Sequence, residues 1–162
     1  MLALYSDHYV IELPANHPFP IQKYRLTREQ LVAEGSLGPD DLLEPTLVVP
    51  TDVRMVHTDE YWEQLTTGSL SASAIRRLGL PWSEALVRRA RASVQGTLTA
   101  ARIAIRHGVA VNLAGGTHHA FPDRGEGYCV LNDIAITIRC LQRDAWMQRM
   151  VEALPEGVVV VI

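Results

Sequence analysis

Two short segments between residues 115 and 129 contain the residue types best suited to chemistry. The first, GGTHH, places His118 and His119 directly after a glycine pair, and the second, GEGYC, places Gly127 and Tyr128 shortly after them. Imidazole titrates near neutral pH, so two histidines on one irregular loop suit general acid and base catalysis or polarisation of a bound carbonyl. The pair therefore predicts a site of proton transfer.

The same segments also have structural interpretations, which the sequence leaves open. A histidine in a loop is often a solvated or hydrogen-bonded side chain, and Gly125 and Gly127 could simply form a turn. Tyr128 could equally form one wall of a narrow substrate channel. Binding of a metal by the histidine pair is disfavoured, because no Cys, His or Asp cluster in the sequence completes a ligand set.

Composition excludes several classes of protein. The chain has 162 residues, 48% of them apolar, which suits a single domain with one core. Fifteen basic against 18 acidic residues give a net charge of −3, so we expect neither nucleic acid nor an anionic membrane as partner. Cys129 and Cys140 form no disulfide framework, and the start lacks the features of a signal peptide, which favours a cytoplasmic location. We interpret Cys129 as a small buried hydrophobic residue.

Hydrophobic periodicity and breakers predict the elements that must position the histidines. In the first half of the chain, we expect a strand at 2–5, a loop at 14–20, a helix at 23–33 and a broken β-rich run at 43–49. Short helices capped by Thr51 and Thr58 follow, and then a connecting loop at 68–81. In the second half, we expect a helix from the N-cap Ser83 to His107, a strand at 109–113, a helix capped by Asn132 and Asp133, and a strand at 158–162.

The last two strands are apolar without alternation, as expected when helices cover both faces of a parallel sheet. With a helix between them they form a βαβ unit, and ligands of such sheets lie beyond the carboxyl ends of the strands. The histidine loop, the segment that begins with GGTHH, follows the first of these strands and is therefore expected beyond the carboxyl ends of the strands. The chain ends on the second strand, before the loop that should supply a partner for the histidines. Residues 1–162 are thus predicted to be the amino-terminal portion of one domain, incomplete at the C-terminus.

GGTHHA followed by GEGYCVLNDIAI resembles the histone deacetylase family of zinc-dependent amidohydrolases, including bacterial acetoin-utilisation-type and class IV-like members. YSDHY with HPFPIQKY, VHTDEYWEQL and LPWSEALVRRARASVQGTLTAARIA also resemble the amino-terminal half of bacterial deacetylases. The resemblance implies an arginase/deacetylase-like α/β fold, in which helices flank a parallel sheet. It also implies hydrolysis of an N-acetyl or acyl amide, of the acetyl-lysine or polyamine type.

The resemblance assigns roles to particular positions. His118 and His119 match the tandem histidines, one a general base and the other an acid or electrostatic partner. Gly127 and Tyr128 match the glycine and aromatic residue that line the acyl-lysine tunnel, where the family usually has phenylalanine.

Positions near the amino terminus match less completely. His17 and Pro18 match a loop at the inner end of the pocket and are expected to contact substrate. Lys23 lies near a position where many relatives carry an arginine, which puts a role in acetate exit there in doubt.

The resemblance implies zinc as the cofactor of the complete domain. In the family, the strand equivalent to VVVVI leads into an Asp-x-Asp-x-His segment with two zinc ligands, and this segment is absent here, as are the later ligand and the oxyanion-stabilising residue. No metal ligand is assigned in this chain, and we expect it to bind no zinc and to be inactive alone.

Two other functions remain open. The chain could be a truncated, non-catalytic remnant that acts as an interaction module or as half of a split enzyme, with self-association or a complementing C-terminal segment. It could also bind a small ligand with the histidine loop and perform no chemistry.

Overall fold

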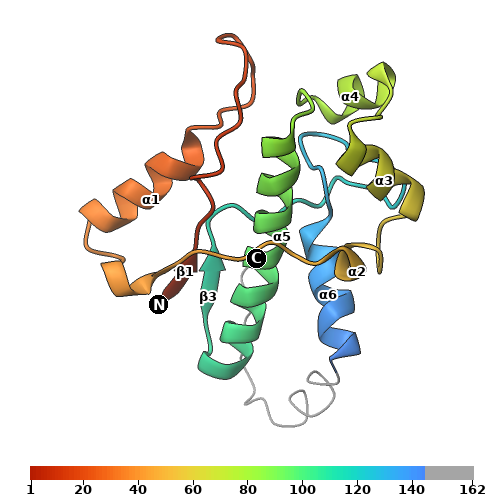
Figure 1. Cartoon of the computed structure of the whole chain (residues 1–162). Helices are drawn as coiled ribbons and strands as arrows, with labels where there is room; N and C mark the ends of the chain where they lie inside the picture. The colour runs from red at the N-terminus through yellow and green to blue at the C-terminus, as the bar shows by residue number, and fades with distance from the viewer. Residues whose placement is uncertain (145–162) are drawn as a thin grey trace.

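The computed structural model describes residues 1–144, in which helices surround a small sheet (Figure 1). The elements are β1 (Leu2–Leu4), α1 (Lys23–Ala33), the 3-10 turn η1 (Pro39–Asp41), β2 (Leu42–Leu43), α2 (Pro50–Val53), α3 (Asp59–Thr67), α4 (Ala72–Leu78), α5 (Glu84–His107), β3 (Ala110–Asn112) and α6 (Asp133–Arg143). The predicted strand at 158–162, the predicted continuation of α6 toward Pro155 and the βαβ crossover lie outside the described residues.

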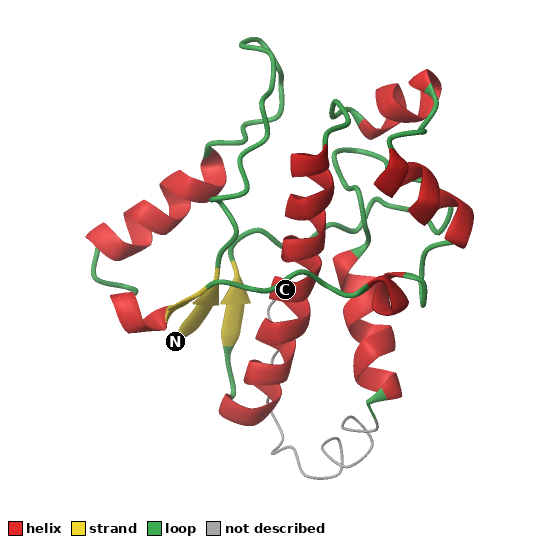
Figure 2. Cartoon of the chain, viewed as in Figure 1, coloured by secondary structure: helices red, strands yellow, loops and turns green. Residues whose placement is uncertain are grey.

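The sheet is parallel, with strand order β2-β1-β3, which confirms the predicted α/β class. Ala3 pairs with Leu42 on one side and with Val111 on the other. Because the strands run in the same direction, the loops that follow β1 and β3 leave the sheet at the same edge (Figure 2). The segment after β1 and the histidine loop after β3 are therefore brought to one end of the molecule.

Helix α5 is the central element and packs against β3, β1 and α6 (Figure 1). It begins as predicted, because the Ser83 hydroxyl accepts the backbone N–H of Leu86. Arg106 and His107 occupy its last turn, where positive charge favours the negative end of the helix dipole, and Gly108 follows with a positive φ. The predicted helix is confirmed along its whole length.

Apolar residues form two clusters on the faces of α5. The larger joins α5 with α3, α4 and α6 and includes Leu65, Leu98 and Ile136, each at most 1% exposed. The smaller lies between α5 and the sheet and contains Leu4 with Ala100, Ala104 and Ala110. The small alanine side chains allow the helix to approach the strands closely, and this packing positions the loop after β3.

The region at 68–81, predicted as a connecting loop, instead contains α4. Ser71 caps this helix by accepting the backbone N–H of Ala74, and Gly79 ends it in a left-handed conformation. The prediction was wrong because the surrounding glycines, serines and Pro81 hide a helix of only seven residues.

Two further local predictions were wrong. In the β-rich run at 43–49 only its first residue, Leu43, is in a strand, and Pro45 and Pro50 supply no N–H for a ladder. Helix α2 begins at Pro50 after Val49, so Thr51 lies inside the helix and is not its cap. Thr58 does cap α3, because its hydroxyl accepts the backbone N–H of Tyr61.

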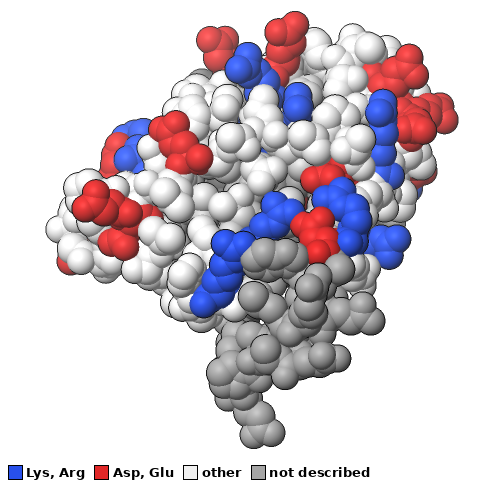
Figure 3. Space-filling model, turned by 60° about the horizontal axis from the view of Figure 1, so that its bottom comes forward, with Lys and Arg blue, Asp and Glu red and all other residues white. Residues whose placement is uncertain are grey.

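The surface carries mixed charge. On the face turned forward in Figure 3, Lys and Arg side chains lie among Asp and Glu side chains. Asp144, for example, forms ion pairs with both Arg102 and Arg143. Within residues 1–144, no helix has the combination of length and apolar character needed to cross a membrane.

Candidate functional site

A fully buried carboxylate, Asp133, holds the histidine loop in place. It accepts the backbone N–H groups of Gly116 at 2.9 Å and Thr117 at 2.7 Å, and the Thr97 hydroxyl of α5 at 2.5 Å. The Thr117 hydroxyl adds a contact at 2.8 Å. Asp133 is the first residue of α6, where the helix dipole favours negative charge. Sequence reasoning treated it as a helix cap, but its side chain turns back and fixes the two residues before His118.

Gly115 is required by the packing of this network. A Cβ atom at this position would lie 2.7 Å from Thr97 Oγ1 and 2.9 Å from Asn112 Nδ2. Asn112 Nδ2 also donates to Thr97 Oγ1 at 2.8 Å, so neither group can withdraw without breaking a bond. The first glycine of GGTHH therefore lets the chain lie directly on the polar face of α5.

Asn132 fixes the other side of the loop. Its Oδ1 accepts the backbone N–H of Ala135, which makes it the predicted N-cap of α6. Its Nδ2 donates to the carbonyls of Ala120 at 3.1 Å and His118 at 3.4 Å. One side chain thus caps the helix and holds the backbone on both sides of His119.

The structure brings the two histidine rings together. His118 and His119 are both exposed, and their ring centroids lie 4.2 Å apart with the planes tilted by 40°. His118 Nδ1 lies 2.9 Å from the Gly116 carbonyl. Because a carbonyl only accepts, Nδ1 carries the proton, and the neutral ring presents Nε2 as an unprotonated base. This tautomer suits proton abstraction.

Gly127 and Tyr128 form the tip of a two-residue hairpin between Glu126 and Cys129. Their φ angles are +56° and +68°, both left-handed, as the tightest hairpin turns require. For tyrosine this conformation costs about 1–2 kcal/mol. A hydrogen bond from the Tyr128 N–H to the Leu78 carbonyl, 2.8 Å long, holds the strained residue against α4. Strain of this kind persists where the surrounding structure fixes a side chain in a functional position.

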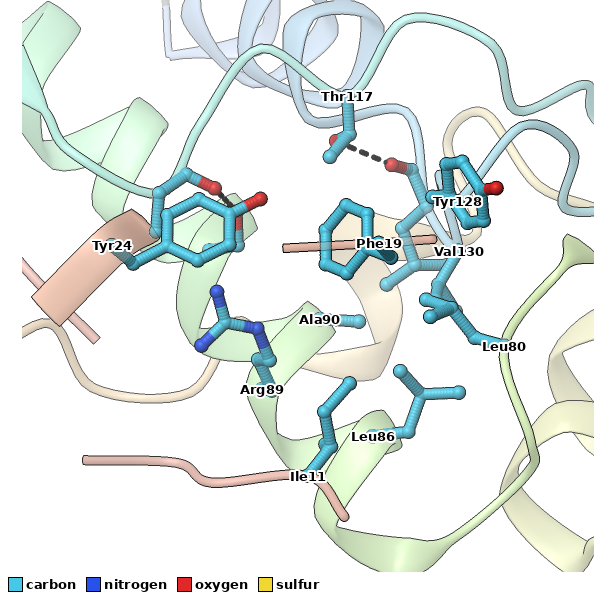
Figure 4. Close-up of a pocket in the computed structure, with 13 residues that line it drawn as sticks. Ile11, Phe19, Tyr24, Leu80, Leu86, Arg89, Ala90, Thr117, Tyr128 and Val130 are labelled. Carbon is cyan, nitrogen blue, oxygen red and sulfur yellow. Dashed lines mark hydrogen bonds between the residues drawn. The ribbon is translucent and has the colours of Figure 1, made fainter. Parts of the chain in front are cut away.

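An apolar pocket lies below the histidine loop, and Tyr128 forms part of its wall (Figure 4). The Tyr128 ring lies 5.0 Å from the Phe19 ring, so the loop after β1 and the hairpin share that wall. The other side holds Arg89, only 8% exposed, whose guanidinium lies 4.3 Å from the Tyr24 ring. Thr117 also lines the pocket and connects it to the adjacent His118.

Arg89 is a buried charge that sequence reasoning missed. It donates to the carbonyls of Ser6 and Tyr9, both at 3.4 Å, and burial lowers its pKa. The signal in the sequence was a basic residue at a helical spacing of three from Leu86, on the face of α5 that points inward. Arg89 gives the otherwise apolar pocket one positive group.

His17 and Pro18 lie beside this pocket, in a neighbouring groove. His17 Nδ1 accepts the Phe19 N–H at 3.1 Å, so Nε2 carries the proton and donates to the Gly79 carbonyl at 2.8 Å. Both ring nitrogens are thus occupied in tying the loop to α4. The role of His17 and Pro18 in contacting substrate stays a prediction.

The Lys23 ammonium group lies over two aromatic rings, those of Phe19 and Tyr24. Its Nζ is 5.2 Å from the Phe19 ring centroid and 5.0 Å from that of Tyr24. These are cation–π distances, so Lys23 steadies two residues that line the pocket.

Cys129 is buried as predicted, at 7% exposure. Burial raises the pKa of its thiol, although the backbone N–H groups of His119 and His118 oppose this shift. A neutral thiol behind the histidine pair packs as a small apolar group.

The described residues do not fit a zinc ion by themselves. Within residues 1–144, no group of three or more His, Cys, Asp or Glu side chains is placed to hold a metal. A catalytic zinc site needs about three protein ligands.

A protein-family model and several known proteins match the part of the chain that contains this site. A model of the histone deacetylase domain matches residues 17–151. An uncharacterised protein of Picosynechococcus sp. is 41% identical over 147 residues, covering 91% of this chain and 49% of its own length. The acetoin utilization protein AcuC of Bacillus subtilis is 33% identical over 151 residues, covering 86% of this chain and 39% of its own.

The fold has solved counterparts as well. The crystal structure of an HDAC homologue from Aquifex aeolicus superimposes with a TM-score of 0.76 at 24% identity, over 88% of this chain and 41% of that one. The chain spans about half or less of the length of these relatives.

Proposed function

Because the chain belongs to the histone deacetylase domain family, we propose that its loop at 115–128 supplies the histidine pair and one channel wall for hydrolysis of an N-acetyl amide. The observation that carries this proposal is the approach of the His118 and His119 rings to 4.2 Å, on the loop whose Thr117 lines the same pocket as Tyr128. The substrate class is an acetylated lysine, polyamine or similar small molecule, and the site of action is the cytoplasm.

The two histidines divide the proton transfers between them. His118, protonated on Nδ1 by its bond to the Gly116 carbonyl, takes a proton from the attacking water on Nε2. His119 donates a proton to the leaving amine as the C–N bond breaks, and the products are acetate and the free amine.

Tyr128 and Phe19 provide the apolar wall for the chain that carries the acetyl group. The methylene stem of a lysine or polyamine can pack against these adjacent aromatic rings, which exclude water from the amide. The Tyr128 hydroxyl distinguishes this wall from the phenylalanine that the family usually has there.

We further propose that zinc and its ligands belong to the complete domain and lie outside residues 1–144. In the complete domain, zinc supplies a Lewis acid for the amide carbonyl. The 162-residue chain alone is then expected to show no hydrolysis of a fluorogenic acetyl-lysine peptide in the presence of added zinc.

A complementation assay tests both parts of the proposal. The portion of the Picosynechococcus relative that this chain does not match would be expressed separately and mixed with the chain. We expect hydrolysis only in the mixture, and a loss of at least about 100-fold for His118→Ala and His119→Ala. His107→Ala, an exposed histidine at the end of α5, is the matched control and should retain full activity. Normal turnover by the chain alone would refute its inactivity, and an active mixture that tolerates loss of both histidines would refute their role.

A second candidate function is an interaction module, favoured by the position of β3. The strand order β2-β1-β3 leaves the outer edge of β3 without a partner among the described strands. An unpaired strand edge is a template for another chain. Light scattering after size exclusion should show concentration-dependent association, and a strict monomer at all concentrations would count against this function.

A further inference from the structure

His57 contacts Asn132, one of the residues that hold the histidine loop, although it is far from that loop in sequence. It precedes Thr58, the N-cap of α3, and is 2% exposed. Its Nε2 accepts the backbone N–H of Asn132 at 3.0 Å. The adjacent Thr58 N–H donates to the Pro122 carbonyl at 2.9 Å. Residues 57 and 58 therefore hold both ends of the segment 122–132, which contains the Tyr128 hairpin.

The contact with Asn132 requires a neutral imidazole. An imidazolium carries a proton on each nitrogen and can accept no hydrogen bond, so it would face the Asn132 N–H with a second donor. Burial disfavours the charged ring and lowers the pKa of His57, while the carbonyls of Pro122 and Phe121 oppose this shift. Nδ1 makes no hydrogen bond of good geometry within the described residues.

Asn132 carries the effect of His57 to the catalytic pair. Its backbone is fixed by His57, and its side chain donates to the carbonyls of Ala120 and His118. A displacement of Asn132 would therefore move the backbone on both sides of His119. The hydrogen bonds thus run from His57 through Asn132 to the backbone of the histidine loop.

We propose that His57 is a positioning residue, a neutral imidazole that fixes the Asn132 backbone and thereby the placement of His118 and His119. The role concerns the geometry of the loop and holds whether or not the pair hydrolyses an amide. This role gives a structural explanation for His57 in the motif VHTDEYWEQL.

We assign the acid response of the contact with Asn132 to His57 and not to its titratable neighbours. The Tyr61 ring centroid lies 5.5 Å away, and burial raises its pKa, so the phenol is neutral in acid. The charged groups on the surrounding elements are engaged in other contacts: Asp59 pairs with Arg54, Asp123 and Glu126 pair with Arg124, and Asp133 binds Gly116 and Thr117.

The sign of the pH effect follows from the lowered pKa. An unfolded histidine gains its proton near pH 6.5, whereas folded His57 gains it only at lower pH. The stabilising contact is complete above pH 6.5 and is lost as the pH falls through the folded value. The contact between His57 and Asn132 should therefore weaken in acid.

Two substitutions separate the roles of the acceptor and of titration. In His57→Gln, the amide oxygen can accept the Asn132 N–H and does not titrate. In His57→Leu, the ring is replaced by an apolar group and the acceptor is lost. His107→Gln changes an exposed histidine and serves as control. Amide and imidazole NMR spectra of the chain report Asn132, His118 and His119 directly, without any need for activity.

In the unsubstituted chain and the control, the Asn132 amide should shift in one acid transition. This transition should be absent from His57→Gln, which should keep native spectra at neutral pH. In His57→Leu, hydrogen exchange at Asn132 should be faster by about tenfold or more, as expected for loss of one hydrogen bond. Unchanged exchange at Asn132 in a folded His57→Leu, or an acid transition at the Asn132 amide that persists in His57→Gln, would overturn the proposal. The His57→Gln comparison decides the question if His57→Leu fails to fold.

Discussion

The Asp133 carboxylate accepts the Thr117 backbone N–H at 2.7 Å, and this bond joins the first residue of α6 to the residue before the histidine pair. Two segments 16 residues apart thereby become one rigid unit. The general base that we propose at His118 needs a fixed position, because proton transfer depends on the distance to the reacting atom.

Replacing Asp133 by asparagine should destabilise the chain by about 2–3 kcal/mol. The amide keeps one oxygen, so it cannot accept both the Gly116 and Thr117 N–H groups, and its NH2 group would face a donor. Urea unfolding followed by circular dichroism measures the change. Asp123→Asn alters an exposed carboxylate that pairs with Arg124 and should cost less than about 1 kcal/mol. Equal stabilities of the two variants would contradict the central role of Asp133.

Asn132→Ala should cost about 1–2 kcal/mol, because it removes the cap of α6. It should also shift the His118 amide resonance, since the bonds to the His118 and Ala120 carbonyls are lost. Ser71→Ala removes the equivalent cap from α4 and is the matched control. We expect that variant to lose stability without a change at His118, and an identical NMR response from both variants would argue against the bridging role of Asn132.

Tyr61→Phe should lower the free energy of unfolding by about 1–1.5 kcal/mol. The buried Tyr61 hydroxyl donates to the Val130 carbonyl at 2.8 Å, and phenylalanine would leave that carbonyl unpaired. Thermal unfolding would detect the loss. Tyr5→Phe removes an exposed hydroxyl that donates to Glu44 and should have a smaller effect. A larger loss from Tyr5→Phe than from Tyr61→Phe would refute this account.

Both cysteines should resist a disulfide reagent at pH 8 until the chain unfolds. Cys129 and Cys140 are buried, and burial raises the pKa of each thiol, that of Cys140 to about 11. An unfolded thiol ionises near pH 8.5, so the folded state loses relative stability as the pH rises from 8.5 through 11. Absorbance of the released thiolate measures the reaction, and Ser69→Cys, at an exposed position, supplies a rapidly reacting control. Rapid labelling of the folded native chain would show that the thiols are accessible.

The sequence alone determined the elements whose signals are local. The apolar spacing along α5, the Ser83 cap and Gly108 specify a helix by interactions between residues three or four apart, and the structure confirms it. The glycines of GGTHH and GEGYC likewise marked the turns. The GGTHH motif predicted the histidine loop, and the predicted parallel sheet placed this loop beyond the carboxyl end of β3.

Only the tertiary structure decided which groups hold the histidines. Asp133 meets Thr97 across 36 residues, and His57 meets Asn132 across 75, so no local pattern could specify either contact. The sequence showed these residues as a cap, a polar residue on a helix and part of a motif. Their roles arise because burial removes water as a hydrogen-bond partner for these polar groups, and folding alone brings their protein partners within reach.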